Sequence, residues 1–250
     1  MTDTGSITFV PSVHFSPTHR RRVRETIRDV DPDLVAVELD ERRFERLDRE
    51  QRGSPFDLAR ELPPPTAAAY ATLQALQRTV VRLYGLDPTK TDMETAIETA
   101  AELDLDVALI DDPIPDTLEA LSRRVGLETL PKLLIRAQTR GPADYARQFE
   151  VMTTPFSEVT DGDDVQPVID QLRQLLPEVA EVLIDRRDRS MAARLRRLRA
   201  DGYDVVAVIG AGHHNGIRRA LSDLDEGVPD RTPAVPIRTP SRAVTRIPID

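Results

Sequence analysis

Apolar residues gather in four short runs, and stretches with helical spacing separate them. The runs cover residues 6–13, 34–39, 106–110 and 204–209. Runs of this length between turn residues are typical of buried strands. Helical patterns are expected at 17–30, 41–51, 66–83, 91–103, 117–125, 130–139, 165–176 and 178–200. The alternation predicts an α/β fold with a central mixed sheet flanked by helices.

Prolines punctuate the last thirty residues. They restrict the segments at 235–238 and 243–249 to edge strands or an extended tail. We therefore expect an α/β domain over residues 1–220, with helical insertions at about 45–105 and 115–200, and a proline-rich extension over 221–250.

Composition narrows the classes of function. The 250 residues carry a net charge of −9, which argues against a nucleic-acid partner. There is no cysteine, so thiolate chemistry is excluded. No apolar run approaches the length of a membrane span, and the N-terminus does not resemble a signal peptide, so we expect a cytoplasmic protein. Basic residues are nearly all arginine, which favours a salt-loving, haloarchaeal source.

Histidines are the first candidates for chemistry. His14 and His213 each follow a predicted strand, at the mouth of a loop that leads into a helix. In α/β sheets, ligands bind at such places. The two positions form two strand–histidine-loop–helix units. His19 lies at the start of a basic helix, and we expect it to be solvated.

Glu38 is the second candidate, because it lies in a run that should be buried. A buried carboxylate needs a partner or a metal ion. It shares a strand face with Leu34 and Ala36, and it lies at the strand end where His14 and His213 would emerge. Two histidines and a carboxylate suit Zn²⁺, Mn²⁺ or Co²⁺ with an open position for water. Alternatively, Glu38 is a general base or a partner in a structural ion pair with arginine.

Several neighbours could support this site. Asp111 ends the third strand and could cap the next segment or orient a ligand histidine. Gly210 and Gly212 belong to a glycine-rich loop, 210–216, which could also cradle a phosphate. Too little chain follows that loop for a complete dinucleotide-binding half. Arg187 and Asp188 lie on an arginine-rich helix, most of which should be solvated.

Five segments resemble motifs of the TraB/PrgY proteins, which are related to the Tiki and GumN groups. VPSVHFS at 10–16 is similar to G-T-x-H-x-S, and VELDERRF at 37–44 to V-E-L-D-x-x-R-Y. LIDDPI at 109–114 resembles L-I-D-R-D-I, RRDRSMA at 186–192 resembles E-R-D-x-Y-M-A, and VIGAGH at 208–213 resembles V-V-G-A-G-H. The motifs occur in the family's order.

The resemblance implies a metal-dependent hydrolase of the peptidase type, because Tiki members are metal-dependent proteases. By this resemblance His14, Glu38 and His213 would bind a divalent metal, and Glu38, Arg187 and Asp188 would serve catalysis. The partner would be a peptide or small-molecule substrate, and the chain could form a homo-oligomer. Three departures favour the alternative, a peptide- or ligand-binding module of the pheromone-shutdown kind that has lost the chemistry. Pro11 replaces a glycine, Asp112 an arginine and Arg186 a glutamate.

Overall fold

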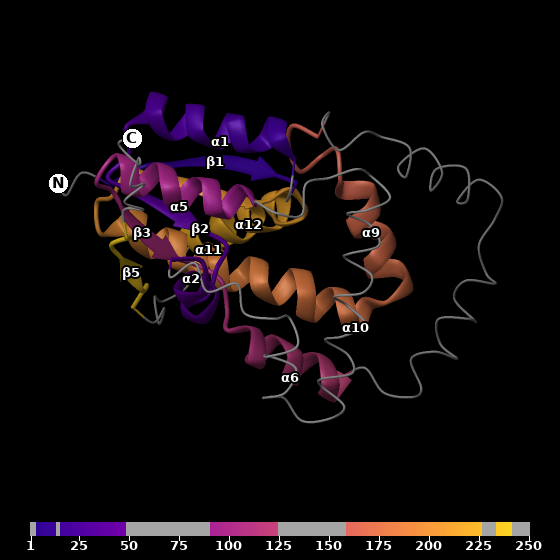
Figure 1. Cartoon of the computed structure of the whole chain (residues 1–250). Coiled ribbons are helices and arrows are strands. Elements are labelled where there is room, and N and C mark those ends of the chain that lie inside the picture. The colour runs from indigo at the N-terminus through magenta and orange to yellow at the C-terminus, as the bar shows by residue number, and fades with distance from the viewer. Residues whose placement is uncertain (1–3, 14–15, 49–90, 125–158, 227–233, 242–250) are drawn as a thin grey trace, which may run out of the picture.

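The computed structural model places five strands in one mixed sheet, in the order β1-β4-β2-β3-β5 (Figure 1). The structure describes residues 4–13, 16–48, 91–124, 159–226 and 234–241. The strands are β1 (Ile7–Ser12), β2 (Leu34–Val37), β3 (Asp106–Leu109), β4 (Val205–Gly210) and β5 (Ile237–Arg238). The first four are parallel, and β5 runs antiparallel to β3. The expected α/β architecture is confirmed.

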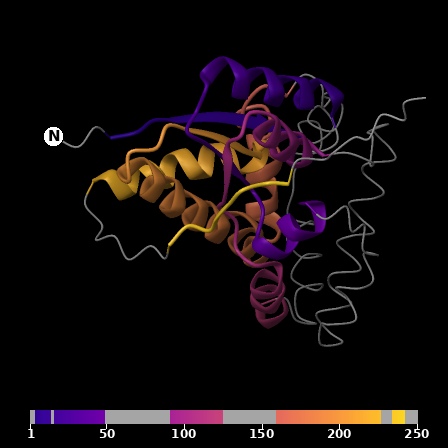
Figure 2. The same cartoon turned by 60° about the vertical axis from the view of Figure 1, so that its left-hand side comes forward.

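Helices cover both faces of the sheet (Figures 1 and 2). On one face lie α1 (Pro17–Val30) and α5 (Asp92–Glu102), and on the other α11 (Arg186–Ala200) and α12 (Ala211–Asp225). The remaining described helices are α2 (Glu41–Asp48), α6 (Ile114–Arg124), α9 (Gln166–Leu175), α10 (Pro177–Ala180) and the π-helical turn η2 (Glu181–Asp185).

Alternation along β2 divides the core into two layers. Val35 and Val37 pack with α1 and α5, whereas Leu34 and Ala36 pack with α11 and α12. Each buried Leu or Val side chain contributes about 1.5–3 kcal/mol relative to an exposed one. The next side chain on the Leu34 face is that of Glu38, so the pattern directs a carboxylate toward α11 and α12.

The helix beginnings follow from local chemistry. Pro17 opens α1, where its missing N–H costs no hydrogen bond, and α1 ends at Asp31 in the left-handed region with φ of 51°. In α5, the Glu94 N–H donates to Thr91 Oγ1 at 3.1 Å, and the Thr91 N–H donates to the Glu94 carboxylate. This capping box fixes the start of a helix that packs on β2 and β3.

Two predictions about element limits need correction. The helix expected over 178–200 is divided into α10, η2 and α11, with the π-helical turn just before Arg186. The loop expected over 210–216 is already helix from Ala211. The helices expected at 66–83 and 130–139 and the edge strand expected at 243–249 lie outside the described residues. The proline-rich extension contributes β5, which pairs with the edge of β3.

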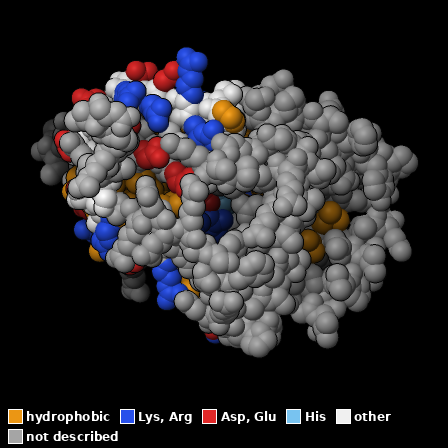
Figure 3. Space-filling view, in the orientation of Figure 1, with side chains coloured by type: hydrophobic (Ala, Val, Ile, Leu, Met, Phe, Trp, Pro, Cys, Tyr) orange, Lys and Arg blue, Asp and Glu red, His pale blue; other side chains and the backbone are white. Residues whose placement is uncertain are grey.

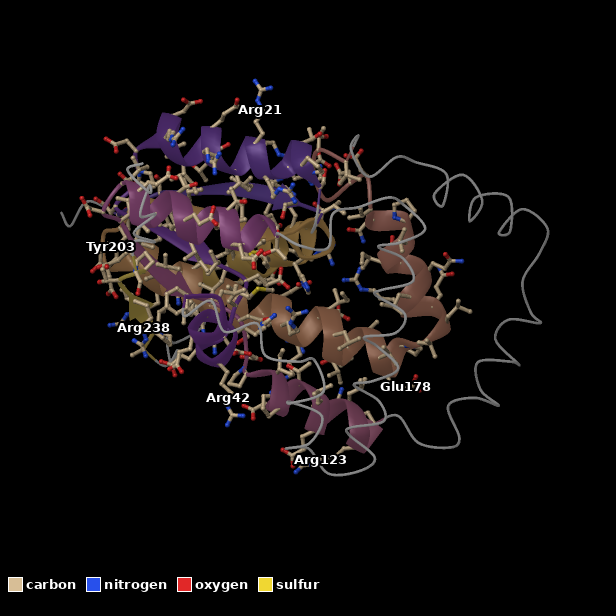
Figure 4. All side chains as sticks on the ribbon, in the orientation of Figure 1. Arg21, Arg42, Arg123, Glu178, Tyr203 and Arg238 are labelled. Carbon is tan, nitrogen blue, oxygen red and sulfur yellow. The ribbon has the colours of Figure 1, made fainter. Side chains whose placement is uncertain are left out.

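The described surface carries charges of both signs. Figure 3 shows acidic and basic side chains intermixed along the edge where α1 lies. An example is the pair Arg21–Glu25, whose arginine points away from the body of the molecule (Figure 4). Among the helices that the structure describes, none is both long and apolar enough to cross a membrane.

Candidate active site

Polar side chains converge at the carboxyl ends of the parallel strands. Glu38 follows β2, Asp111 follows β3, and His213 lies in the first turn of α12, directly after β4. Arg187 reaches the same edge from the start of α11. Parallel strands bring their carboxyl ends to one edge, which is where open α/β sheets bind ligands. The site therefore forms from segments far apart in the sequence.

Arg187 lies at the centre of this cluster. It donates two hydrogen bonds to Asp111, from Nε to Oδ1 at 2.9 Å and from Nη2 to Oδ2 at 2.8 Å. Nη2 also donates to Glu38 Oε1. The other Glu38 oxygen, Oε2, accepts the Gly210 N–H at 2.7 Å. Glu38 is 6% exposed, so these contacts supply the partners that a buried carboxylate requires.

His213 connects the cluster to Asp188. The Arg187 Nη1 group donates to His213 Nε2 at 3.0 Å, because a guanidinium can only donate. The His213 proton therefore belongs on Nδ1, which donates to Asp188 Oδ1 at 2.6 Å. Nε2 lies 3.3 Å from Glu38 Oε1. Asp188 thus fixes the ring so that an unprotonated nitrogen faces Glu38.

Burial and charge act on these groups in opposite directions. Burial by itself would raise the pKa of Asp111, but the guanidinium groups of Arg187 and Arg43 outweigh it and lower that pKa. Burial would lower the pKa of Arg187, yet the Glu38 and Asp111 carboxylates raise it well above its ordinary range. For Asp188, burial prevails over the contact with His213 and raises the pKa of the carboxyl. Arg187 therefore remains charged beside two carboxylates.

Arg43 and Asp40 support the cluster, and residue-by-residue reasoning overlooked both. Arg43 donates to Asp111 Oδ2 and, from Nε, to Asp40 Oδ2 at 3.3 Å. Asp40 in turn accepts the Arg43 N–H at 2.8 Å and the Ile114 N–H at 3.0 Å. Both residues belong to the VELDERRF motif, so the resemblance to that family motif could have identified them as site residues. Asp111 was expected either to cap the next segment or to orient a histidine. Its Oδ1 accepts the Asp112 N–H at 2.8 Å, and Arg187 and Arg43 donate to the same carboxylate, whereas Asp188 orients His213.

Two of the three proposed metal ligands, Glu38 and His213, lie among the described residues. Glu38 Oε1 and His213 Nε2 lie side by side. Asp188 accepts the Nδ1 hydrogen bond and so orients the His213 ring, as carboxylates do for metal-binding histidines. His14 lies outside the described residues. Among the residues that are described, no group of three His, Asp or Glu side chains has metal-binding geometry. The donor types fit a divalent ion, but Arg187 contacts the same two atoms, so an ion would compete with its guanidinium.

The glycines after β4 do not form a loop; they lie at the start of α12 and let other side chains pack closely against it. A Cβ at position 216 would lie 1.8 Å from Asp188 Oδ2, so only glycine leaves room for this carboxylate. A Cβ at Gly212 would lie 3.2 Å from the side chain of Ile169. The Gly210 N–H, which the phosphate interpretation needs, already donates to Glu38. The glycine-rich segment is therefore the start of a tightly packed helix.

The other described histidines have structural contacts. His19 is buried rather than solvated, with 1% exposure, and its Nδ1 accepts the Val13 N–H at 2.6 Å. The prediction of a solvated His19 was wrong because the apolar face of α1, not its basic character, decides its burial. His214 Nδ1 accepts the Gly162 N–H at 3.1 Å, and burial lowers the pKa of this ring.

Comparison with known proteins agrees with these motifs. The model of the TraB/PrgY/gumN family matches residues 2–227. The chain belongs to this family. An uncharacterized protein of Methanocaldococcus jannaschii is 30% identical over 224 residues, which are 88% of this chain and 54% of that protein. The chain therefore spans about half the length of this relative.

Two departures from the TraB motifs compensate each other. In those motifs the position of Asp112 carries arginine and that of Arg186 carries glutamate; here the charges are exchanged. The two side chains face each other, with Arg186 Nε 3.8 Å from Asp112 Oδ2. Asp112 also accepts hydrogen bonds from Ser190 at 2.6 Å and Arg194 at 3.1 Å. The two departures thus form an ion pair with each other in this chain.

The third departure, Pro11, lies on the edge strand β1. The N–H and C=O of one strand residue point to the same side. The Pro11 carbonyl accepts from Arg22 on α1, so its nitrogen also faces the open edge and not β4. The missing N–H removes no bond of the sheet. In the described part of the chain, no side-chain hydrogen bond or ion pair joins Pro11, Asp112 or Arg186 to Glu38, Arg187 or His213.

Proposed function

We propose that the chain is a hydrolase of the peptidase type whose reacting groups are Glu38 Oε1 and His213 Nε2. The observation that carries the proposal is their separation of 3.3 Å, with the second oxygen and the second nitrogen held by Gly210 and Asp188. Such orientation of both groups is what a preorganised site needs. A merely structural ion pair would not require the Asp188 contact.

Each residue has a role in this proposal. Glu38 Oε1 accepts the proton of the attacking water, as a general base does. Arg187 faces the same space and offers positive charge to the substrate carbonyl oxygen, which becomes negative when water attacks. Asp188 keeps the proton of His213 on Nδ1, so that Nε2 stays available to the site.

A divalent ion, Mn²⁺, Co²⁺ or Zn²⁺, is the alternative use of Glu38 in this proposal: His14, Glu38 and His213 would hold it, and Glu38 would then be a ligand instead of the base. When bound, such an ion supplies Lewis-acid chemistry that polarises a carbonyl and activates water. Because Arg187 contacts Glu38 and His213, its guanidinium would have to withdraw from them. The substrate would be a peptide, and the cytoplasm the place of action.

A library of fluorogenic peptides, assayed with each metal or with a chelator, tests the proposal. Glu38→Gln and His213→Asn should each lower hydrolysis about 100-fold or more. Arg197→Gln is the matched control, since Arg197 is an exposed α11 residue that pairs with Asp201. Hydrolysis by wild type that survives Glu38→Gln would overturn the assignment. Metal uptake that is lost in His213→Asn would separately support the ion.

One observation favours a second candidate, a binding module without catalysis. Arg187 neutralises Glu38 and Asp111 within the chain, so the described cluster is satisfied without an added ion. In that case the thermal midpoint would not respond to added metals, and no peptide of the library would be cleaved.

A further inference from the structure

The π-helical turn η2 lies directly before the residues of α11 that reach the candidate active site. Its wider winding is seen at Arg186, whose N–H donates to the Glu181 carbonyl and so skips the acceptor that an α-helix would use. Such turns are rare and frequently occur at functional sites. Val182 and Ile184 within the turn are buried, so η2 belongs to the packed interior and not to a frayed helix end.

The turn supplies one acceptor to Arg187. The Leu183 carbonyl accepts from Arg187 Nη1 at 3.2 Å. Together with the contacts to Asp111, Glu38 and His213, it gives every N–H group of the guanidinium an acceptor. Nη1 carries two hydrogens, and because Leu183 takes one, the other is directed at His213 Nε2. The backbone of η2 thus contributes to the orientation of the guanidinium in the site.

Arg173 on α9 holds the end of this turn. α9 lies beside the start of the helix that runs from α10 through η2 into α11 (Figure 1). Arg173 donates from Nε at 3.0 Å and from Nη2 at 2.6 Å to Oδ1 of Asp185, the last residue of η2. The two side chains are 25% and 29% exposed, so water screens this pair less than a fully exposed one. A charged contact therefore joins α9 to the turn that carries the Leu183 carbonyl.

We propose that Arg173 is a positioning residue for Arg187. Its contact with Asp185 holds the π-helical turn in the shape that offers the Leu183 carbonyl to the guanidinium. Without that contact the turn can relax toward α-helical winding, in which this carbonyl accepts the backbone N–H of Arg187 instead. Nη1 then loses an acceptor, and the guanidinium gains freedom to leave the site. The inference rests on the proposed function only in its effect on hydrolysis.

Exchange of the Arg187 Nε–H proton with water tests this role without any hydrolysis. The signal is measured in a proton–nitrogen correlation spectrum of the full chain and is identified by its absence in Arg187→Lys. In Arg173→Met and in Asp185→Asn it should exchange about tenfold faster than in wild type, because the guanidinium contacts open more often. Asp170→Asn is the matched control, since it removes a contact of Arg173 that stays within α9, and exchange there should remain within about twofold of wild type.

Three results would overturn the positioning role. One is exchange at the wild-type rate in Arg173→Met or in Asp185→Asn. Another is equal acceleration in Asp170→Asn, because the effect would then come from α9 in general and not from its contact with the turn. The third is a double variant, Arg173→Met with Asp185→Asn, that exchanges much faster than either single variant, since removal of one shared contact is not additive.

Hydrolysis of peptides separates this inference from the proposed function. Arg173→Met should lower kcat about fivefold and leave KM within about twofold of wild type, because Arg187 acts on the substrate carbonyl oxygen as it becomes negative. Wild-type hydrolysis with an unchanged Arg187 signal in Arg173→Met overturns the positioning role alone. Faster exchange in Arg173→Met, together with a wild type that cleaves no peptide, overturns the proposed function alone.

Discussion

Both faces of the sheet bury polar side chains at the same edge, but the partners of these side chains differ. On the α1–α5 face, His19 accepts the Val13 N–H, and Asp92 accepts the N–H of Met93 in the first turn of α5 and the hydroxyl of Ser12. On the α11–α12 face, Glu38, Arg187 and His213 contact one another through their functional groups. Burial and mutual contact of polar side chains therefore occur on both faces. What distinguishes the α11–α12 face is that a carboxylate and an imidazole, those of Glu38 and His213, contact one guanidinium.

Removing Arg187 should give the largest effect. Arg187→Met leaves the buried carboxylates of Glu38 and Asp111 without their shared cation, which should cost about 3–5 kcal/mol of unfolding free energy. Urea denaturation measures this loss. The control Arg189→Met removes an exposed neighbour that pairs with Glu181, and it should cost no more than about 1 kcal/mol. Equal losses in both variants would mean that the cluster is no stronger than a surface pair.

Asp111→Asn should cost about 1.5–3 kcal/mol at neutral pH, because charged hydrogen bonds to Arg187 are weakened. The difference from wild type should depend on pH. In the folded protein the pKa of Asp111 is lowered below its ordinary value of 3.8, so its stabilisation is fully present above pH 3.8. It should fade as the pH falls through the lowered folded value. A stability gap between wild type and variant that stays constant down to the acid transition would contradict this linkage.

His19→Ala tests the opposite face. It should cost about 1–3 kcal/mol, because the Val13 N–H loses its acceptor in a buried place. Since His19 does not touch the Arg187 cluster in any described contact, its loss of unfolding free energy should add to that of Arg187→Met in the double variant. A double variant that departs from the sum by more than about 0.5 kcal/mol would show that the two faces are coupled.

The exchanged charges of Asp112 and Arg186 should give the smallest effect. Asp112→Asn and Arg186→Gln, measured alone and together, should show a coupling of about 0.2–1 kcal/mol, as ion pairs with one exposed partner do. Zero coupling in this double-mutant cycle would mean that the two departures from the family motifs are unrelated.

Periodicity predicted the sheet because each strand is a short apolar run, and it predicted the convergence of Glu38 and His213 because parallel strands end at one edge. It could not predict that Asp188, and not Asp111, holds His213. That choice depends on the packing of α11 against α12 at Gly216. It also mistook glycines that permit close packing for glycines of a loop, since both uses look alike in a sequence.

The two ends of the sheet have a consequence for self-association. At one end, β1 offers Pro11, which has no N–H and whose carbonyl is taken by Arg22. At the other, β5 is only two residues long and lies between Pro236 and Pro240. Neither border is a good template for an incoming strand. Addition of a strand from a second copy is therefore disfavoured at both borders of the sheet that the structure describes.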